Sequence, residues 1–254
     1  MTKEERAKQW SFSRLNAFAT CPYSYYLKYV QNQPDKSNAF NLYGSYVHSI
    51  LEKYFKGELE LFELADFYES NFADEVTEEF PPCAFCDLGV KYYDDGLKFF
   101  NGFEGFDNYK VLAVEKEFTV TLFDDYKFHG FIDLLLQDSS GNIVIMDHKS
   151  KKKFDTKAQT EHYALQLLLY GLYVKEKYGV YPDRVIFNMF RSQALVEIDF
   201  TLAKLSAAVQ WAKKTIEQIE KCEDWTKNYS EFFCTNICGY REICCKKEVN
   251  EDGI

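Results

Sequence analysis

The sequence contains no long hydrophobic run. None of its apolar stretches approaches the roughly 20 residues that a membrane-spanning helix needs, and the N-terminal segment MTKEERAKQW lacks the apolar region of a signal peptide. The 254 residues also show no internal repeat and no low-complexity linker. We therefore expect a cytoplasmic protein without a membrane partner.

An excess of positive charge is absent as well. The formal net charge of −10 at pH 7 argues against a protein whose whole surface coats nucleic acid. A local basic channel is still compatible with this balance, although lysines in a loop are often simply solvated. The candidate residues for such a channel are Lys149, Lys151, Lys152, Lys153 and Lys157. Aromatic residues are abundant instead, with 19 tyrosines and 23 phenylalanines, and we assign most of them to the core.

Hydrophobic periodicity predicts both helices and strands. We expect helices at 12–20, 22–30, 41–56, 60–80, 89–106, 155–179 and 202–221. We expect strands at 110–123, 129–136, 143–150, 184–191 and 194–200. Ser11 is a suitable N-cap for the first helix, and Cys21-Pro22 marks a corner between the first two helices because proline fits the start of a new helix.

Charged residues interrupt the two apolar strands between Lys127 and Lys153, which flank a turn rich in Asp, Ser, Gly and Asn. Strict alternation places Asp133 on one face of the first strand, and Asp147 and Lys149 together on one face of the second. A carboxylate in an apolar setting needs a partner or becomes neutral. A divalent metal beside the lysine would satisfy both aspartates, whereas the alternative is ordinary charge on a solvated edge strand.

The cysteines suggest a second kind of site. Eight cysteines in a reducing compartment are better interpreted as metal or cluster ligands than as a disulfide framework. Cys234, Cys238 and Cys244 lie close together in the sequence and indicate a metal or iron–sulfur site whose fourth ligand comes from elsewhere. Zinc in place of iron is the alternative. Three further cysteines receive no role: Cys83 and Cys86, which resemble half of a zinc site, and Cys222.

Several motifs in a fixed order resemble the RecB-type branch of the PD-(D/E)XK nucleases. They are GxxxH at Gly44–His48, Glu115 in a strand, GFID at Gly130–Asp133, DHK at Asp147–Lys149 and QLLLY at Gln166–Tyr170. The segment SFSRLNAFATCPYSYYLKY and the final cysteines resemble the iron–sulfur subgroup, which includes CRISPR-associated exonucleases and the nuclease domains of helicase–nuclease complexes. The resemblance extends from about Ser11 to Cys244.

The resemblance implies an α/β fold in which a restriction-endonuclease-like central mixed sheet is flanked by helices. It implies one nuclease domain over 1–254 with a core at about 41–222. Segments 11–40 and 223–245 would form a subregion in which N- and C-terminal helices join at a cysteine cluster.

The resemblance also implies the roles of individual residues. A Mg²⁺ or Mn²⁺ ion would be held by His48, Asp133, Asp147 and the backbone carbonyl of His148. Lys149 would position the attacking water, and Glu115 would contribute to a second metal or to that water. Substrate contacts are expected from Gln166, Tyr170 and Lys151. Ligands of a four-iron, four-sulfur cluster are expected at Cys21, Cys234, Cys238 and Cys244.

Two features depart from the family pattern. Three residues separate Cys234 from Cys238 where the family usually has two. Cys245 directly follows Cys244, so either of these two cysteines could be the last cluster ligand. Asp147 stands where many members have glutamate, a change that preserves a metal-binding carboxylate.

The implied function is a metal-dependent DNA exonuclease that acts on single strands or DNA ends, in a bacterial, archaeal or virus-infected cell. The alternative is a non-cleaving DNA-binding or adaptor subunit of a recombination or CRISPR-adaptation complex. A helicase or a CRISPR-adaptation protein would be the partner in such an assembly.

Overall fold

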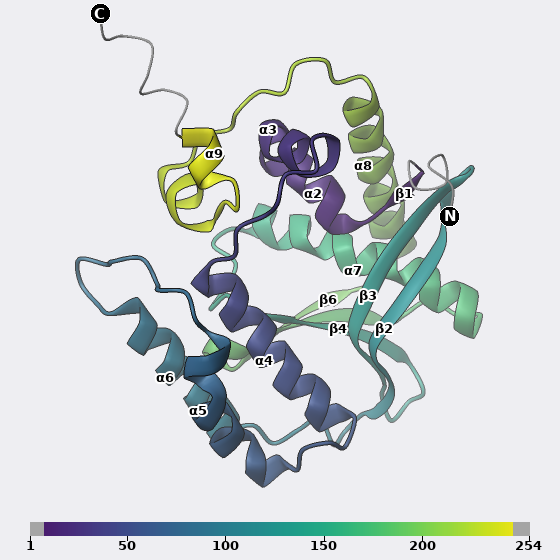
Figure 1. The fold of residues 1–254 in the computed structure, drawn as a ribbon. Coiled ribbons are helices and arrows are strands. Elements are labelled where there is room, and N and C mark those ends of the chain that lie inside the picture. The colour runs from purple at the N-terminus through teal and green to yellow at the C-terminus, as the bar shows by residue number, and fades with distance from the viewer. Residues whose placement is uncertain (1–7, 246–254) are drawn as a thin grey trace, which may run out of the picture.

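The computed structural model describes residues 8–245 and is built on a six-stranded sheet (Figure 1). The strands are β1 (Gln9–Trp10), β2 (Lys110–Phe123), β3 (Tyr126–Gln137), β4 (Ile143–Lys149), β5 (Arg184–Met189) and β6 (Ala194–Asp199). Their order is β1-β3-β4-β5-β6, with β2 paired to β3. The sheet is mixed, because β1 and β3 and also β4 and β5 are parallel whereas the other pairs are antiparallel.

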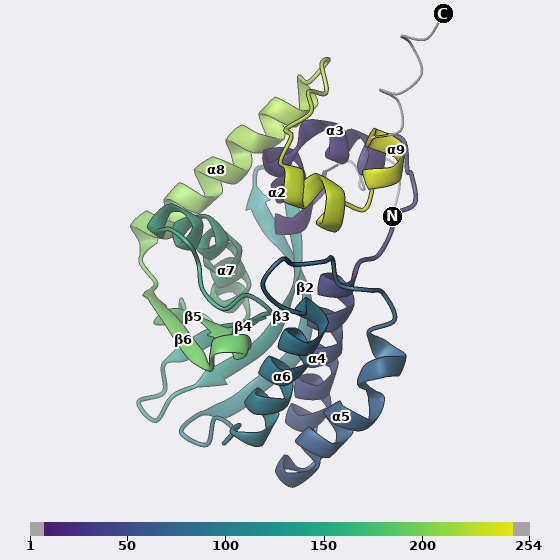
Figure 2. The same ribbon diagram turned by 90° about the vertical axis from the view of Figure 1, so that its left-hand side faces the viewer.

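Helices cover both faces of this sheet (Figures 1 and 2). The α-helices are α2 (Phe12–Thr20), α3 (Pro22–Tyr25), α4 (Ala39–Phe55), α5 (Leu64–Glu75), α6 (Leu88–Asn101), α7 (Lys157–Tyr178), α8 (Leu202–Glu220) and α9 (Arg241–Cys245). Helices α7 and α8 lie on one side, where Ile143 and Ile145 of β4 face them. Helix α4 lies on the other, where Phe55 packs near Val144 and Met146. The predicted α/β fold, a central mixed sheet flanked by helices, is confirmed.

Most predicted elements are present, and the differences have local causes. In place of the single helix predicted at 60–80, the structure has a short 3₁₀ turn at Leu61–Glu63 followed by α5. Helix α5 ends at Glu75. Acidic residues crowd its C-terminal end, where the helix dipole disfavours negative charge. The helix predicted at 89–106 ends at Asn101, because Gly102 caps it and Gly105 adopts φ +77°. Strand β1 was not predicted, since two residues are too few for an alternating pattern.

The predicted alternation along β3 is wrong at Asp133. Ile132 and Leu135 pack in the same hydrophobic cluster, although strict alternation would place them on opposite faces. Opposite this point, Glu115 of β2 adopts φ +44°, a left-handed conformation that is uncommon for a residue other than glycine. The β2–β3 pair is therefore locally distorted where Glu115 and Asp133 lie.

Helices α2 and α3, from the N-terminal part of the chain, and α9, from its C-terminal part, lie together above the sheet (Figure 1). Asn38 caps α4 by accepting the Asn41 N–H at 3.0 Å, and it also donates to the Ile237 carbonyl at 2.9 Å. The Lys36 N–H donates to the Gly239 carbonyl at 3.1 Å. The C-terminal segment is thereby tied to the start of α4. The division into a core and a cysteine-joined subregion stays a prediction.

No helix within residues 8–245 is both long enough and apolar enough to cross a membrane.

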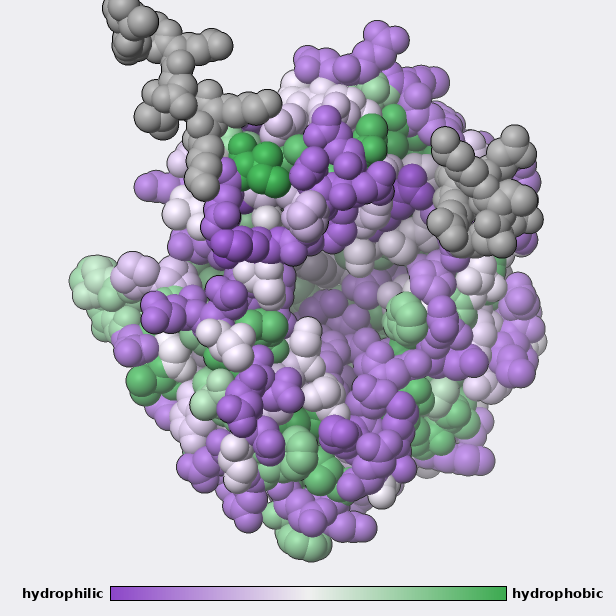
Figure 3. Space-filling view, viewed as in Figure 1, coloured by the Kyte–Doolittle hydropathy of each residue, from purple (hydrophilic) through white to green (hydrophobic). Residues whose placement is uncertain are grey.

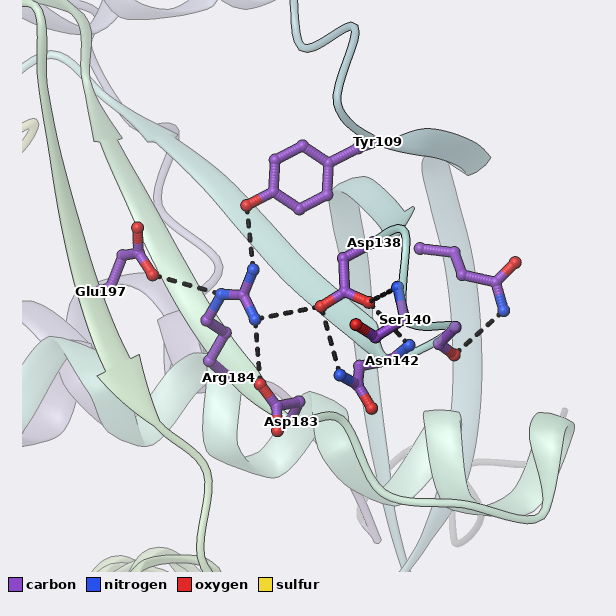
Figure 4. A network of polar contacts seen from close by, with 9 residues as sticks. Tyr109, Asp138, Ser140, Asn142, Asp183, Arg184 and Glu197 are labelled. Carbon is purple, nitrogen blue, oxygen red and sulfur yellow. Dashed lines mark hydrogen bonds and ion pairs between the residues drawn. The ribbon is translucent and has the colours of Figure 1, made fainter.

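An arginine holds the far end of the sheet together (Figure 4). The Arg184 guanidinium lies 3.3 Å from Asp138, 2.9 Å from Asp183 and 3.2 Å from Glu197, and it donates to the Tyr109 hydroxyl at 3.0 Å. Asp138 also accepts the Ser140 and Asn142 backbone N–H groups, so it shapes the β3–β4 turn. One cation therefore joins the turn to β5 and β6.

Replacing Arg184 with glutamine should destabilise the protein. The change would leave the partly shielded Asp138 and the exposed Asp183 and Glu197 without their shared cation, and we expect a loss of about 1 kcal/mol in the free energy of unfolding. Urea denaturation measures this loss. Lys110→Gln, an exposed site at the start of β2, is the control and should change stability by less than about 0.5 kcal/mol. Equal effects from both variants would contradict the role of the network.

Candidate active site

The site lies where β3 and β4 separate. Their pairing ends at Leu134 and Met146, whereas β4 continues beside β5 as far as Lys149. In the fork, the Asp133 Oδ2 accepts the backbone N–H of His148 at 2.8 Å. The polar side chain thus replaces the ladder hydrogen bond that the splayed strands no longer make, and the carboxylate is held in place.

Lys149 and Asp147 form an ion pair in the same fork. The Lys149 Nζ lies 2.6 Å from the Asp147 Oδ2, and it donates to the Gln166 Oε1 at 3.3 Å. Burial works to lower the pKa of Lys149, but the charges of Asp147 and Asp133 outweigh it and raise the pKa. The buried Asp147 Oδ2 accepts no hydrogen bond of acceptable geometry from any described residue. Lys149 is therefore a cation at neutral pH, with its charge directed into the fork.

His48 reaches the fork from α4. Its Nε2 lies 2.8 Å from the His148 carbonyl, which can only accept, so we assign the proton to Nε2. Burial lowers the pKa of His48 and favours the neutral ring. The lone pair on Nδ1 then lies 3.4 Å from the Asp133 Oδ2. Two acceptors facing each other are unfavourable unless a cation or proton lies nearby.

Ligand atoms of His48, Glu115 and Asp133 all lie within 4.8 Å of one another. Burial, and then the nearby Glu52 and Asp147 charges, raise the pKa of Glu115. Burial, and then Asp147, raise the pKa of Asp133 well above its usual value. Oxygen donors with one imidazole suit a divalent cation. A cation here would relieve the repulsion that causes part of these shifts, so the donor set fits a metal ion.

The group of His48, Glu115 and Asp133 lies beside a recess in the molecular surface. A cavity of about 300 Å³ is lined by Gly44, His48, Glu52 and Glu115, among others. Figure 3 shows a shaded hollow with hydrophilic surface between the upper helices and the region of α4. A polar substrate can therefore approach the acidic group from this side.

Comparison with known proteins identifies the family. The sequence model of the PD-(D/E)XK nuclease superfamily matches residues 9–245. The chain belongs to this superfamily. Nucleases of this type use divalent metal ions, in agreement with the candidate site formed by His48, Glu115 and Asp133.

A solved structure shows the same fold. A proposed exonuclease from Eubacterium rectale has a TM-score of 0.56 at 18% sequence identity, and the match covers 100% of this chain and 96% of that protein. The structure of SSO0001 has a TM-score of 0.41 at 15% identity and covers 97% of this chain and 89% of its own. None of the curated proteins matches this chain.

The structure also gives the surroundings of the three predicted substrate-contact residues, Gln166, Tyr170 and Lys151. Gln166 donates to the Tyr170 hydroxyl at 2.8 Å, so Tyr170 orients the amide that contacts Lys149. Tyr170 is only 5% exposed and packs over Gly130, where a Cβ atom would come within 2.8 Å of its ring. Substrate contact stays a prediction for Gln166, Tyr170 and Lys151. The Lys151 Nζ lies 5.9 Å from the centre of the Tyr163 ring.

The His148 side chain contacts Asn188 of β5. It is 3% exposed, and its Nδ1 lies 3.0 Å from the Asn188 amide nitrogen. Its backbone carbonyl bonds to His48, and its role as a metal ligand stays a prediction.

The four predicted cluster cysteines line one cavity. Its volume is about 520 Å³, and the lining includes Cys21, Cys234, Cys238 and Cys244. Burial raises the pKa of the Cys238 thiol, and Cys234 and Cys21 act on it in the same direction. The structure therefore places an N-terminal cysteine at the same cavity as three C-terminal ones, and their role as cluster ligands stays a prediction.

Sequence reasoning missed two residues that hold the loop after Lys149. Asp95 on α6 accepts from Arg191 Nε at 3.1 Å and Nη2 at 2.8 Å, and from Lys152 Nζ at 2.8 Å. The Arg191 guanidinium also stacks 3.3 Å from the centre of the Tyr92 ring. These residues come from separate elements, so no local sequence pattern links them. The pair fixes the lysine-bearing loop beside the fork.

Asp95→Asn should lower nuclease activity while the fold survives. Without the carboxylate charge, Arg191 and Lys152 lose their anchor and the loop after Lys149 shifts, so we expect kcat/KM to fall by about tenfold to a hundredfold. Cleavage kinetics together with thermal denaturation measure this. Asp94→Asn, the neighbouring exposed position on α6, should leave the rate unchanged. An equal decrease in both variants would refute the anchoring role.

Proposed function

We propose that this protein is a divalent-metal-dependent deoxyribonuclease that hydrolyses phosphodiester bonds of single-stranded DNA or at DNA ends, as an exonuclease. The observation that carries the proposal is the fork, where a partly buried lysine lies against Asp147 and next to the group of His48, Glu115 and Asp133. The fold shared with a proposed exonuclease over the whole chain supports it.

The residues divide the chemistry between them. Asp133, His48 and Glu115, with Asp147 close by, would hold Mg²⁺ or Mn²⁺, which supplies Lewis acidity and positive charge at the scissile phosphate. The Lys149 ammonium, positioned by Asp147 and Gln166, orients the attacking water and stabilises charge that develops on the phosphate oxygens.

Because the net charge of the chain is −10, we expect DNA to contact one basic segment and not the whole surface. Lys151 and Lys153 lie two and four residues after the catalytic lysine, whereas Lys152 pairs with Asp95. A short basic segment beside the fork would bind the phosphates that flank the cleaved bond. DNA rather than RNA is proposed from the resemblance to the RecB-type branch.

A non-cleaving adaptor is the second candidate. A binding surface gains nothing from burying Asp133 and Asp147 side by side, since like charges in a low-dielectric site are unfavourable. The retained Lys149 ion pair therefore favours the enzyme. A helicase or CRISPR-adaptation partner stays a prediction for either function.

We also propose that the cysteine cavity holds a four-iron, four-sulfur cluster. Its four cysteines come from both ends of the chain and converge on one space of about 520 Å³. Among the described residues, no three cysteines have sulfur atoms within 4.8 Å of one another, a spacing that a single zinc ion would require. A cluster is larger than one ion and accommodates the wider spacing.

Lys149→Ala should abolish cleavage but retain DNA binding. We expect the cleavage rate to fall by at least about a hundredfold, because the substitution removes the charge beside the phosphate. Labelled single-stranded DNA with Mg²⁺ or Mn²⁺ measures cleavage, and a gel shift in Ca²⁺ measures binding. Lys110→Ala removes an exposed lysine at the start of β2 and serves as the control. If the wild-type protein at high concentration binds the DNA but leaves it uncut, the protein is a non-cleaving adaptor instead.

Cys238→Ser should remove the cluster. We expect the protein purified without air to be brown and to contain about four irons and four sulfides per chain, and the variant to lose both with a lower melting temperature. Metal analysis and visible absorbance test this. Cys222→Ser lies outside the cavity lining and should keep the colour. Colourless wild-type protein containing zinc would refute the iron assignment.

A further inference from the structure

Two cysteines outside the cavity lie next to each other on an exposed loop. The loop joins α5 to α6 and projects from the body of the molecule (Figure 1). The Cys83 and Cys86 sulfur atoms are 3.3 Å apart, and residues 82–87 are all exposed. Phe85 between them is 98% exposed. Both thiols are therefore open to reagents in solution, and they already touch.

The two thiols differ in character. The Cys86 thiol donates to the Cys83 sulfur. The Phe85 backbone N–H and the Cys86 thiol lower the pKa of Cys83, whereas its contact with Cys83 raises the pKa of Cys86. Cys83 therefore carries the greater thiolate fraction, and thiolates are the nucleophiles in disulfide exchange. This asymmetry distinguishes an attacking sulfur from a resolving one.

Within the part of the chain that the structure describes, a metal site at the pair lacks further ligands. In residues 8–245, no third His, Cys, Asp or Glu has a ligand atom that forms a compact group with these two sulfur atoms. The cysteines that line the cavity are other residues. Two adjacent thiols without a third ligand are suited to redox chemistry.

We propose that Cys83 and Cys86 are a reversible dithiol–disulfide site that reacts with low-molecular-weight disulfides. This site is independent of the nuclease fork. A disulfide across it closes only a four-residue segment, so it adds little chain-entropy stabilisation. Its role is exchange with the thiol pool.

The thiol–disulfide exchange takes place in two steps. The Cys83 thiolate attacks one sulfur of glutathione disulfide, which breaks the glutathione S–S bond and releases one glutathione thiolate. Cys86 then loses its proton and attacks the Cys83 sulfur, which breaks the mixed disulfide and releases the second glutathione thiolate. Two protein thiols are oxidised to one disulfide, and glutathione disulfide is reduced to two thiols that take up the protons. The sulfur atoms must approach from 3.3 Å to about 2.05 Å.

The test follows the two cysteines by mass spectrometry after treatment of the intact protein with glutathione disulfide under anaerobic conditions. In the wild type, the peptide that contains both residues should lose two hydrogens without accumulating a glutathione adduct. Cys86→Ser should trap glutathione on Cys83, and Cys83→Ser should trap it on Cys86 at least fivefold more slowly. Dithiothreitol should restore the wild-type dithiol.

Cys222→Ser is the matched control, because its thiol instead donates to the Asp224 carbonyl at 3.2 Å. It should leave closure of the Cys83–Cys86 disulfide unchanged. Equal trapping rates in the two single variants would overturn the proposal, as would a wild type that accumulates glutathione adducts without closing the disulfide. Zinc bound to the untreated protein and released by Cys83→Ser would overturn it as well, since the pair would then be a metal site.

Discussion

The fork between β3 and β4 places acidic groups closer together than an apolar interior tolerates. Asp133 and Asp147 are buried on strands that stop pairing at that point. Their repulsion is reduced by Lys149 and by the His148 N–H, and the remaining excess of negative charge suits a divalent cation. Most other features of the site serve to keep this unfavourable arrangement intact.

Each surrounding element contributes one restraint on the fork. Helix α4 supplies His48 and bonds it to the His148 carbonyl, and helix α7 supplies Gln166 to the lysine. Glu115 adopts a left-handed backbone conformation, a costly geometry that tends to persist where function requires it. The chemistry therefore depends on the packing of elements against a strand junction.

The cysteine-lined cavity is connected to the same site through the Asn38 side chain and α4. Asn38 caps the helix that carries His48, and the same side chain bonds to the Ile237 carbonyl beside Cys238. Because Asn38 is only 4% exposed, these hydrogen bonds are shielded from water. A group that holds the cysteines together would thus also hold the start of α4.

Local patterns in the sequence determined the helices, most strands and the identity of the chemical groups, because periodicity and motif spacing are properties of neighbouring residues. They placed Asp133, Asp147 and Lys149 on adjacent strands, in agreement with the structure. Tertiary structure alone decided that β3 breaks alternation, that Glu115 joins His48 and Asp133, and that Asp95 anchors the lysine loop. Those outcomes depend on where strands separate and helices pack, and contacts between distant segments leave no local signal.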